Sequence, residues 1–430
     1  MIKFAIITLG CKVNLYESEN YVQSLKEAGY IEVAFNEQAD IYIINTCTVT
    51  NTASSKSRQK INQARKQNPK AIICAVGCLV QIGDEKLDQL DGIDIMIGST
   101  HKDQLVSLIN NALSKNEKYR VVDDVRQNSN FDELYVSNFT HHTRAFLKIQ
   151  DGCDQFCAYC IIPYARGKER SLAPDKVIEQ AKKLLSNGHK EIVLSGIHTG
   201  RYGKEHQTNL TALIKQLLIT NIYRLRISSI EITEITDEMI LLIKEDDRLA
   251  KHLHIPLQSG CDKILTLMKR PYDTVYFLDR IRYIQQMIPD ISISTDIIVG
   301  FPGESEEDFM KTLSFIKEVN FSFLHVFPYS KKSGTVAAQM ADQISQDVKR
   351  SRVTQLISLS DKLYETYQKT FLAKEVDIIM EAEKDGKWMG HSSHYLPIEI
   401  DSDELYRNKV YNVSITSYEN LHLLGRIVEV

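Results

Sequence analysis

The sequence feature that most restricts the fold is a regular alternation of short, β-rich apolar runs with segments of helical spacing. From residue 144 to residue 330 the apolar runs are RAFLKIQ, EIVLSG, RLRISSIE, HLHIPLQS, ISISTDIIVG and FSFLHVFPYS, and helical segments such as PDKVIEQAKKLLSNG separate them. Strands joined through helices pair in parallel, so these six units predict a parallel barrel. The barrel should be partial, because a complete one has eight strands.

The flanking segments predict two further domains in this α/β chain. Residues 1–118 show the same alternation, with KFAIITLG, ADIYIINTC, AIICAVGCL and DIMIGS as strands, and predict a small parallel α/β domain. Residues 119–143 are polar and acidic and are interpreted as a linker. Residues 144–372 hold the partial (β/α)6 barrel, and residues 373–430 show short strands without helical spacing, which predicts a small β-barrel.

Composition narrows the setting in which the chain works. With 43% hydrophobic and 25% charged residues and no apolar run of the roughly 20 residues that span a membrane, the chain is expected to be soluble, with no membrane contact. Its first residues lack a signal peptide, so we expect a cytoplasmic location. The eight cysteines are then not expected to form disulfides, and metal binding or catalysis explains them better.

The segment CDQFCAYC carries the strongest chemical signal, with Cys153, Cys157 and Cys160 in a C-x3-C-x2-C spacing directly after a predicted strand. Three thiolates in one tight loop hold three irons of a [4Fe–4S] cube and leave the fourth iron open to another ligand. S-adenosylmethionine (SAM) binds such an iron, and an electron from the cluster then splits it to a 5′-deoxyadenosyl radical. A zinc site is the alternative, but no usual fourth ligand lies nearby.

Three further cysteines, Cys11, Cys47 and Cys78, each follow a predicted strand of the N-terminal domain. The carboxyl ends of parallel strands meet at one edge of a sheet, so these thiols are expected to converge on a second cluster site. The alternative is that they are buried apolar residues. That role suits Cys74 better, because it lies in the middle of a predicted strand.

Net charge is −4, so any contact with a polyanion has to be local. Between Asn51 and Val80 there is no acidic residue, which indicates a phosphate-contacting surface, with a solvated helix face as the alternative. The basic residues of this segment are Lys56, Arg58, Lys60, Arg65, Lys66 and Lys70. After the cysteine loop, Arg166, Lys168 and Arg170 are candidates to hold a phosphate or carboxylate, unless they form surface salt bridges.

These motifs together resemble the methylthiotransferase family of radical SAM enzymes over the whole chain. The resemblance rests on CDQFCAYC, IIPYARGKERS, HIPLQSGCDKILTLMKRPY, DIIVGFPGESEEDF and HVFPYSKKSGT, and on TLGCKVNLYESE, INTCTVT and Gly77-Cys78 in the N-terminal domain. Within the family, TLGCKVN with NTCTVT is most similar to the branch that acts on N6-threonylcarbamoyladenosine beside the tRNA anticodon. The branches acting on isopentenyladenosine or on a ribosomal protein usually carry other residues after this GC.

The resemblance implies two [4Fe–4S] clusters and two roles for SAM, as radical source and as methyl donor to sulfur on the auxiliary cluster at Cys11, Cys47 and Cys78. It implies tRNA and an electron donor of the flavodoxin or ferredoxin type as partners, and a monomer is the default. The expected SAM contacts are Tyr159 at the adenine, Ser195 and Gly196 at the methionine end, and Ser228 and Glu231 at the ribose. Gln258 and Asp296, polar residues at strand ends, complete the expected cofactor site. The family usually carries an asparagine near His198, which leaves that contact open.

The C-terminal segment resembles the RNA-binding TRAM domain that ends this family. It holds six Lys or Arg against eleven Asp or Glu, a poor balance for binding phosphates. Trp388 is expected to pack in this barrel rather than stack on a base, and His254 to line the central barrel. The acidity keeps open a basic ribosomal protein, modified at an aspartate, as the substrate. A non-catalytic iron–sulfur RNA-binding or sensor protein is a third, disfavoured hypothesis.

Overall fold

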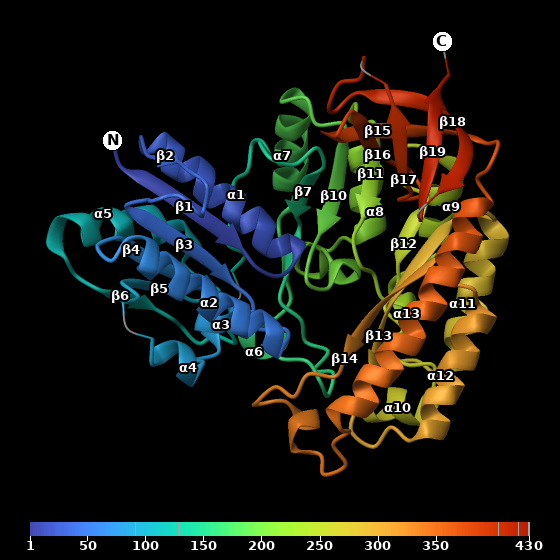
Figure 1. Ribbon diagram of the computed structural model, residues 1–430, viewed down its shortest axis with the longest axis horizontal. Coiled ribbons are helices and arrows are strands. Elements are labelled where there is room, and N and C mark those ends of the chain that lie inside the picture. Colours follow the sequence, from blue (N-terminus) through green and yellow to red (C-terminus); the bar gives the residue numbers. More distant parts are fainter. Residues whose placement is uncertain (91, 128–129, 403, 420, 429–430) are drawn as a thin grey trace.

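The computed structural model describes residues 1–90, 92–127, 130–402, 404–419 and 421–428. It consists of an N-terminal parallel sheet, a central set of parallel strands and a C-terminal β-barrel, which lie against one another (Figure 1). The α/β fold class predicted from the sequence is thereby confirmed. No helix in these described ranges is long and apolar enough to cross a membrane.

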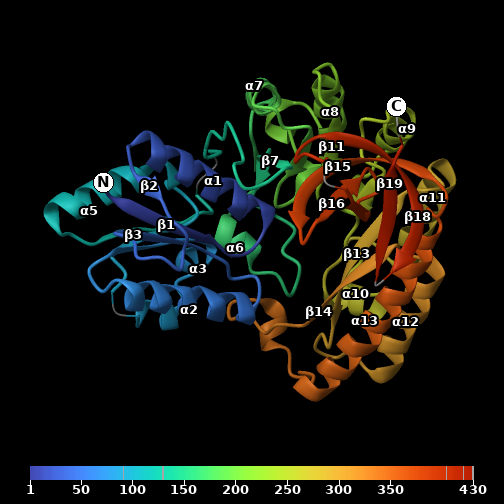
Figure 2. The ribbon, with the colours of Figure 1, turned by 45° about the horizontal axis from the view of Figure 1, so that its top comes forward.

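The N-terminal sheet is entirely parallel, with the strand order β2-β1-β3-β4-β5-β6. Its strands are β1 (Lys3–Thr8), β2 (Ile31–Glu32), β3 (Ile41–Thr46), β4 (Ile72–Gly77), β5 (Ile95–Ile97) and β6 (Tyr119–Val121). Its helices are α1 (Lys12–Glu27), α2 (Asn51–Gln67), α3 (Cys78–Gln81), α4 (Glu85–Asp88) and α5 (Leu105–Lys115). Figure 2 shows the sheet between α1 and α2, each of which buries an apolar face against it. The predicted linker begins too early, because residues 119–121 pair with β5.

The central strands pair in parallel in the order β7-β10-β11 and β12-β13-β14, and bridges at Leu225–Leu249 and Ser229–His254 join the two sheets. The strands are β7 (Ala145–Lys148), β10 (Glu191–Ser195), β11 (Arg224–Ile227), β12 (His252–His254), β13 (Ser292–Val299) and β14 (Phe323–Pro328). A short pair, β8 (Gln150–Asp151) and β9 (Arg170–Ser171), frames the cysteine loop. The side between β7 and β14 is open, as a partial barrel requires.

Helices cover the outside of these strands (Figure 1). They are α7 (Pro174–Ser186), α8 (Leu210–Leu218), α9 (Asp237–Glu245), α10 (Asp262–Leu267), α11 (Thr274–Met287), α12 (Glu306–Val319) and α13 (Gln346–Lys369). The short helix α6 (Ile162–Arg166) lies instead against α3 of the N-terminal domain. Short 3-10 turns occupy Lys102–Gln104, Thr199–Arg201, Lys204–His206, Ile232–Glu234 and Val336–Gln339. Helix α12 begins with a capping box, in which Ser305 and Asp308 each accept a hydrogen bond from the other's backbone N–H.

The C-terminal segment closes into a barrel with the strand order β15-β16-β17-β19-β18. The strands are β15 (Glu375–Lys384), β16 (Lys387–Ser392), β17 (Pro397–Asp401), β18 (Val410–Glu419) and β19 (His422–Ile427). Trp388 packs against the apolar interior of this barrel, as expected. The barrel is attached to the central strands by Arg224 and Arg226 of β11, which donate to the carbonyls of His391, Ser392 and Ser393.

A buried network of charges joins the N-terminal domain to the central barrel. Glu17 of α1 lies 2.6 Å from Lys102, 2.8 Å from Arg166 and 3.2 Å from Lys148. Asp151 lies 2.7 Å from Lys148 and contacts Arg166 as well. Burial alone would raise the pKa of Glu17, but Arg166, Lys102 and Lys148 hold it below its ordinary value. Both carboxylates are therefore ionised, and Glu17 depends on Lys148 and Arg166 of the central domain.

Replacing Glu17 by Gln should destabilise the whole protein, because it leaves buried cations without their shared carboxylate. We expect the free energy of unfolding to fall by about 3–5 kcal/mol in chemical denaturation. The matched control is Glu307→Gln, which breaks the exposed Glu307–Lys311 pair and should cost no more than about 0.5 kcal/mol. Equal losses in the two variants would contradict the structural role of the network.

Candidate active site

The first group of cysteines lies at the carboxyl edge of the N-terminal sheet. Cys11 follows β1, Cys47 follows β3 and Cys78 follows β4, and these strands are neighbours in the sheet. The three loops therefore meet, and each thiol lies close enough to the others for their charges to interact. Gly10 makes this approach possible: its φ is +107°, and a Cβ there would lie 2.9 Å from the sulfur of Cys47. We call Cys11, Cys47 and Cys78 the N-terminal thiol set.

Asn14 holds these loops together. Its amide nitrogen donates to the carbonyls of Leu9 and Thr46 at 2.8 and 3.1 Å, and its oxygen accepts from Arg166 at 2.6 Å. Arg166 also donates from Nε to the sulfur of Cys78 at 3.3 Å. The guanidinium of the central domain is thereby fixed against a thiol of the N-terminal domain.

The second group, Cys153, Cys157 and Cys160, lies in the loop between β8 and α6 and is called the barrel thiol set. The loop is tight, because the Cys160 N–H donates to the Cys157 carbonyl at 2.9 Å. Cys153 Sγ lies 3.4 Å from His198 Nδ1, and Arg270 Nη1 lies 3.4 Å from Cys157 Sγ. The loop is thus held in place from two sides of the barrel.

Burial favours the neutral form of the buried thiols in the absence of a cation. Together with the neighbouring thiols, it raises the pKa of Cys47 to about 11 and that of Cys160 to about 12. Bound iron would reverse this preference, since its positive charge stabilises thiolates. The two sets of three converging thiols, with an arginine beside each, fit a [4Fe–4S] cluster with one open iron.

Within the described parts of the chain, no three His, Cys, Asp or Glu side chains are arranged to bind a single metal ion. A four-iron cluster binds its three thiolates at three different irons, so its ligands stand farther apart than those of one ion. The remaining cysteines have other places. Cys74 is fully buried in β4, and Cys261 is buried before α10 with its sulfur 3.5 Å from Asp308.

The residues predicted to bind SAM come from the cysteine loop and from the strands of the central barrel. Tyr159 is in the cysteine loop itself, Ser195 and Gly196 end β10, and Ser228 and Glu231 follow β11. The Ser228 hydroxyl lies 3.1 Å from that of Thr199, and Asp296 of β13 lies 3.2 Å from His254. Gln258, with a φ of +70°, is paired by backbone hydrogen bonds with the neighbouring strand β13. Asp296 lies within β13, whereas Ser195 ends β10 and Gly196, Ser228 and Glu231 follow strand ends.

Two residues that sequence reasoning did not assign to the site organise it. Arg270 forms an ion pair with Glu231 and lies within 3.5 Å of both Cys157 Sγ and the Tyr159 hydroxyl. His198, a position left open, bonds Cys153 and lies 2.8 Å from Glu234. Arg270 could have been identified from its place in the motif MKRPY. His198 could have been identified from its position just after the end of β10.

The predicted RNA contacts divide into two groups. Arg166 is fully buried and Arg170 is 2% exposed, so neither has a surface with which to contact RNA, contrary to the prediction. Their charges are instead neutralised by Glu17 and Asp151. The exposed basic residues are Lys56, Lys66, Lys70 and Lys168.

The other basic residues of α2 have partners within the N-terminal domain. Arg58 lies 3.1 Å from Asp84. Arg65 lies 2.9 Å from Asp94 and donates to the Ala71 carbonyl, and Lys60 bonds Gln63. These three side chains stabilise the domain, which leaves the lysines as the accessible part of the predicted surface.

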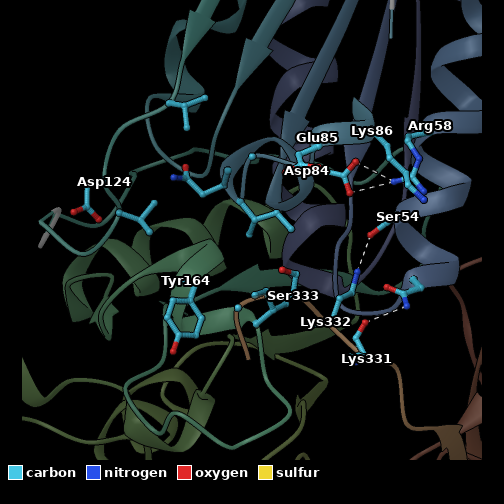
Figure 3. A pocket seen from close by; sticks show the side chains of 18 of the residues that line it. Ser54, Arg58, Asp84, Glu85, Lys86, Asp124, Tyr164, Lys331, Lys332 and Ser333 are labelled. Atoms are coloured by element: carbon cyan, nitrogen blue, oxygen red, sulfur yellow. Dashed lines mark hydrogen bonds and ion pairs between the residues drawn. The ribbon is translucent and has the colours of Figure 1, made fainter. Parts of the chain in front are cut away.

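A cavity of about 1120 Å³ lies beside both cysteine loops. Figure 3 shows Arg58 paired with Asp84 on one wall and Lys332 reaching Ser54 on another, with Tyr164 across the cavity. Lys332 also lies 3.4 Å from Thr48, next to Cys47, and Ile161, next to Cys160, lines the same cavity. The cavity is therefore bordered by residues adjacent to one cysteine of each thiol set.

Comparison with known proteins agrees with this arrangement. The uncharacterized protein family UPF0004 matches residues 3–98, and the radical SAM superfamily matches residues 147–316. The solved structure of the radical S-adenosylmethionine methyltransferase TsrM from Kitasatospora setae shares the fold, with a TM-score of 0.55 at 13% identity over 76% of this chain and 73% of that one.

Curated relatives match from end to end. The threonylcarbamoyladenosine tRNA methylthiotransferase MtaB of Bacillus subtilis is 42% identical over 100% of this chain and 97% of its own length, and that of Aquifex aeolicus is 39% identical over 87% and 92%. The tRNA-2-methylthio-N(6)-dimethylallyladenosine synthase of Thermoanaerobacter pseudethanolicus is 35% identical over 99% and 93%. With these matches and two sets of three converging cysteines, the chain belongs to the radical SAM methylthiotransferase family.

Proposed function

We propose that this protein methylthiolates N6-threonylcarbamoyladenosine beside the anticodon of tRNA, at carbon 2 of the base. The observation that supports the proposal is that one short helix connects the two thiol sets. Helix α6 begins two residues after Cys160 and ends at Arg166, which contacts Cys78. Five residues of helix span roughly 7.5 Å, so chemistry at the barrel set occurs close to the N-terminal set.

When bound, the barrel cluster supplies the electron that cleaves SAM into a radical, and the N-terminal cluster supplies the sulfur transferred to the base. The residues of the chain position and enclose these groups. Arg270 fixes Glu231 and Tyr159, which are expected to contact the ribose and adenine of SAM. His198 and Arg270 hold the cysteine loop, and the buried surroundings exclude water from a reactive radical.

The names of the relatives support a threonylcarbamoyl substrate. The two relatives described first are named for threonylcarbamoyladenosine, and their similarity extends over nearly their whole lengths. Relatives named for dimethylallyladenosine have 35% identity or less among those compared, and they make that nucleoside the second candidate. A ribosomal protein is disfavoured, because these similar chains are named for tRNA.

We assign tRNA contact to the exposed lysines of α2 and to the cavity beside it. Lys56 and Lys66 are exposed, and Lys86, Arg126 and Lys331 line the large cavity. Such cations would bind phosphates near the base that enters the site. The acidic C-terminal barrel, similar to a TRAM domain, would then contribute shape and base contacts, and a small flavodoxin- or ferredoxin-type protein would supply electrons.

Cluster ligation is tested by the iron content of single cysteine variants. The anaerobically loaded protein should hold about eight irons per chain, four from each cluster. Cys160→Ala and Cys78→Ala should each lose about half of this iron, because each removes one thiolate from a different set. Cys74→Ala and Cys261→Ala, which remove buried thiols outside both sets, should keep all of it. Iron loss in these two controls would contradict the assignment.

The substrate is tested by mass spectrometry of tRNA nucleosides from cells with and without this gene. We expect the 2-methylthio form of threonylcarbamoyladenosine to disappear while its precursor accumulates. A plasmid copy of the gene should restore the product, and a Cys160→Ala copy should not. An unchanged threonylcarbamoyladenosine profile together with loss of the methylthiolated dimethylallyl nucleoside would favour the second candidate.

RNA contact is tested by reversing charges on α2. The double variant Lys56→Glu, Lys66→Glu should raise KM for tRNA at least about tenfold at low salt and reduce the salt dependence of binding, because fewer phosphates are neutralised. The matched control is Lys182→Glu with Lys183→Glu, exposed lysines on α7. Equal effects of the two double variants would show that net charge alone, and not this surface, governs binding.

A further inference from the structure

A second, smaller cavity of about 250 Å³ lies inside the central barrel. Inward-facing residues of the central strands line it, and the N-terminal domain contributes Lys12 while the C-terminal barrel contributes Tyr395. Ligand pockets for whole small molecules are usually larger, at about 300–1,000 Å³. A cavity of this size is suited to a substituent of the substrate rather than to a complete nucleotide.

The cavity is positively charged. Lys12, Arg144 and Arg226 line it, and no acidic side chain does so among the described residues. Glu381 lies 3.2 Å from Arg144, and Glu191 lies 2.6 Å from Arg226, so both arginines have acidic partners outside the lining. Lys12, whose side chain is exposed, has no ion pair or hydrogen bond within the described ranges. It is therefore the cation of the lining that has no direct acidic partner.

The polar lining includes a further group without a partner. His252 is 7% exposed, and its Nε2 lies 3.0 Å from the Ser294 hydroxyl. Its Nδ1 has no hydrogen-bond partner in the described structure. Buried polar atoms of this kind are rare unless a ligand or water completes them. The hydroxyls of Ser228 and Ser294 add further hydrogen-bonding groups to the lining.

Tyr395 closes the cavity from the C-terminal barrel. Its φ is +64°, a conformation that bulky residues rarely adopt, and its ring lies 5.0 Å from that of His252. The guanidinium groups of Arg144 and Arg226 lie 5.0 and 5.1 Å from the Tyr395 ring centre. A strained backbone that is retained at such a place commonly serves a binding site.

We propose that this cavity binds the carboxylate and hydroxyl of the threonylcarbamoyl group of the substrate, with Lys12 as the counter-ion of the carboxylate. The proposal rests on the proposed function and names the residues that determine its specificity. Lys12 adjoins Cys11 in the sequence, and Ser228 is expected at the ribose of SAM, so the lining includes a neighbour of each expected cofactor site. An apolar dimethylallyl group would leave the buried Nδ1 of His252 unpaired and would offer Lys12 no carboxylate, which disfavours it.

The test measures binding of the full-length, cluster-loaded enzyme to three anticodon stem-loop RNAs. They carry threonylcarbamoyladenosine, its neutral threonine-amide analogue, or unmodified adenosine. The wild-type enzyme should bind the first about tenfold more tightly than the second, since a charged hydrogen bond contributes at least this factor. Lys12→Met should bind these two RNAs equally tightly, with no weaker binding of unmodified RNA. Lys12→Arg should keep the tenfold preference.

Three controls separate specificity from other effects. Lys26→Met removes a lysine from the same helix, outside the cavity, and should behave as wild type. Iron content and RNA-independent cleavage of SAM should be unchanged in Lys12→Met, which shows that the neighbouring Cys11 still functions. The proposal would be overturned if Lys12→Met still bound the threonylcarbamoyl RNA about tenfold more tightly than its amide analogue. It would also be overturned if the variant kept this preference and lost affinity for SAM instead. If wild-type enzyme fails to methylthiolate the threonylcarbamoyl RNA, the proposed function itself is wrong, whatever the ratio.

Discussion

The arrangement of the whole molecule depends on the buried ion network around Glu17 and Arg166. Charges are expensive to bury, and they are stable here because the carboxylates and cations come from both sides of the junction between domains. The same arginine that pairs with Glu17 also contacts Cys78 and Asn14. The contacts that dock the two domains therefore also hold the N-terminal thiol set in place.

Much of this design was predictable from the sequence, because strand and helix periodicity is a local property. The six central strands, the closed C-terminal barrel and the meeting of Cys11, Cys47 and Cys78 at one sheet edge all follow from it. Cys74 was also placed correctly in a strand core. The start of the linker was wrong, since β6 is only three residues long, Tyr119–Val121, and so short a strand at a sheet edge carries little periodic signal.

The roles of charged residues were less predictable, because they depend on partners far away in the sequence. Arg166 and Arg170 follow the cysteine loop and looked available for RNA, but their partners Glu17 and Asp151 bury them. Arg270 reaches the cysteine loop from 113 residues away and Arg58 is paired with Asp84. A single sequence gives the charge of each side chain but not the position of its counter-ion.

The inner cavity gives a reason for having three domains in one chain. Its cation comes from the N-terminal domain, its walls from the barrel and its closing aromatic ring from the C-terminal domain. No single domain contains the complete binding surface, so the surface exists only when the network around Glu17 and the contacts of Arg224 and Arg226 are formed. Substrate selection therefore depends on docking of the three domains. A chain whose N-terminal domain is not docked lacks Lys12 in the cavity, and so it lacks the cation that recognises the substrate.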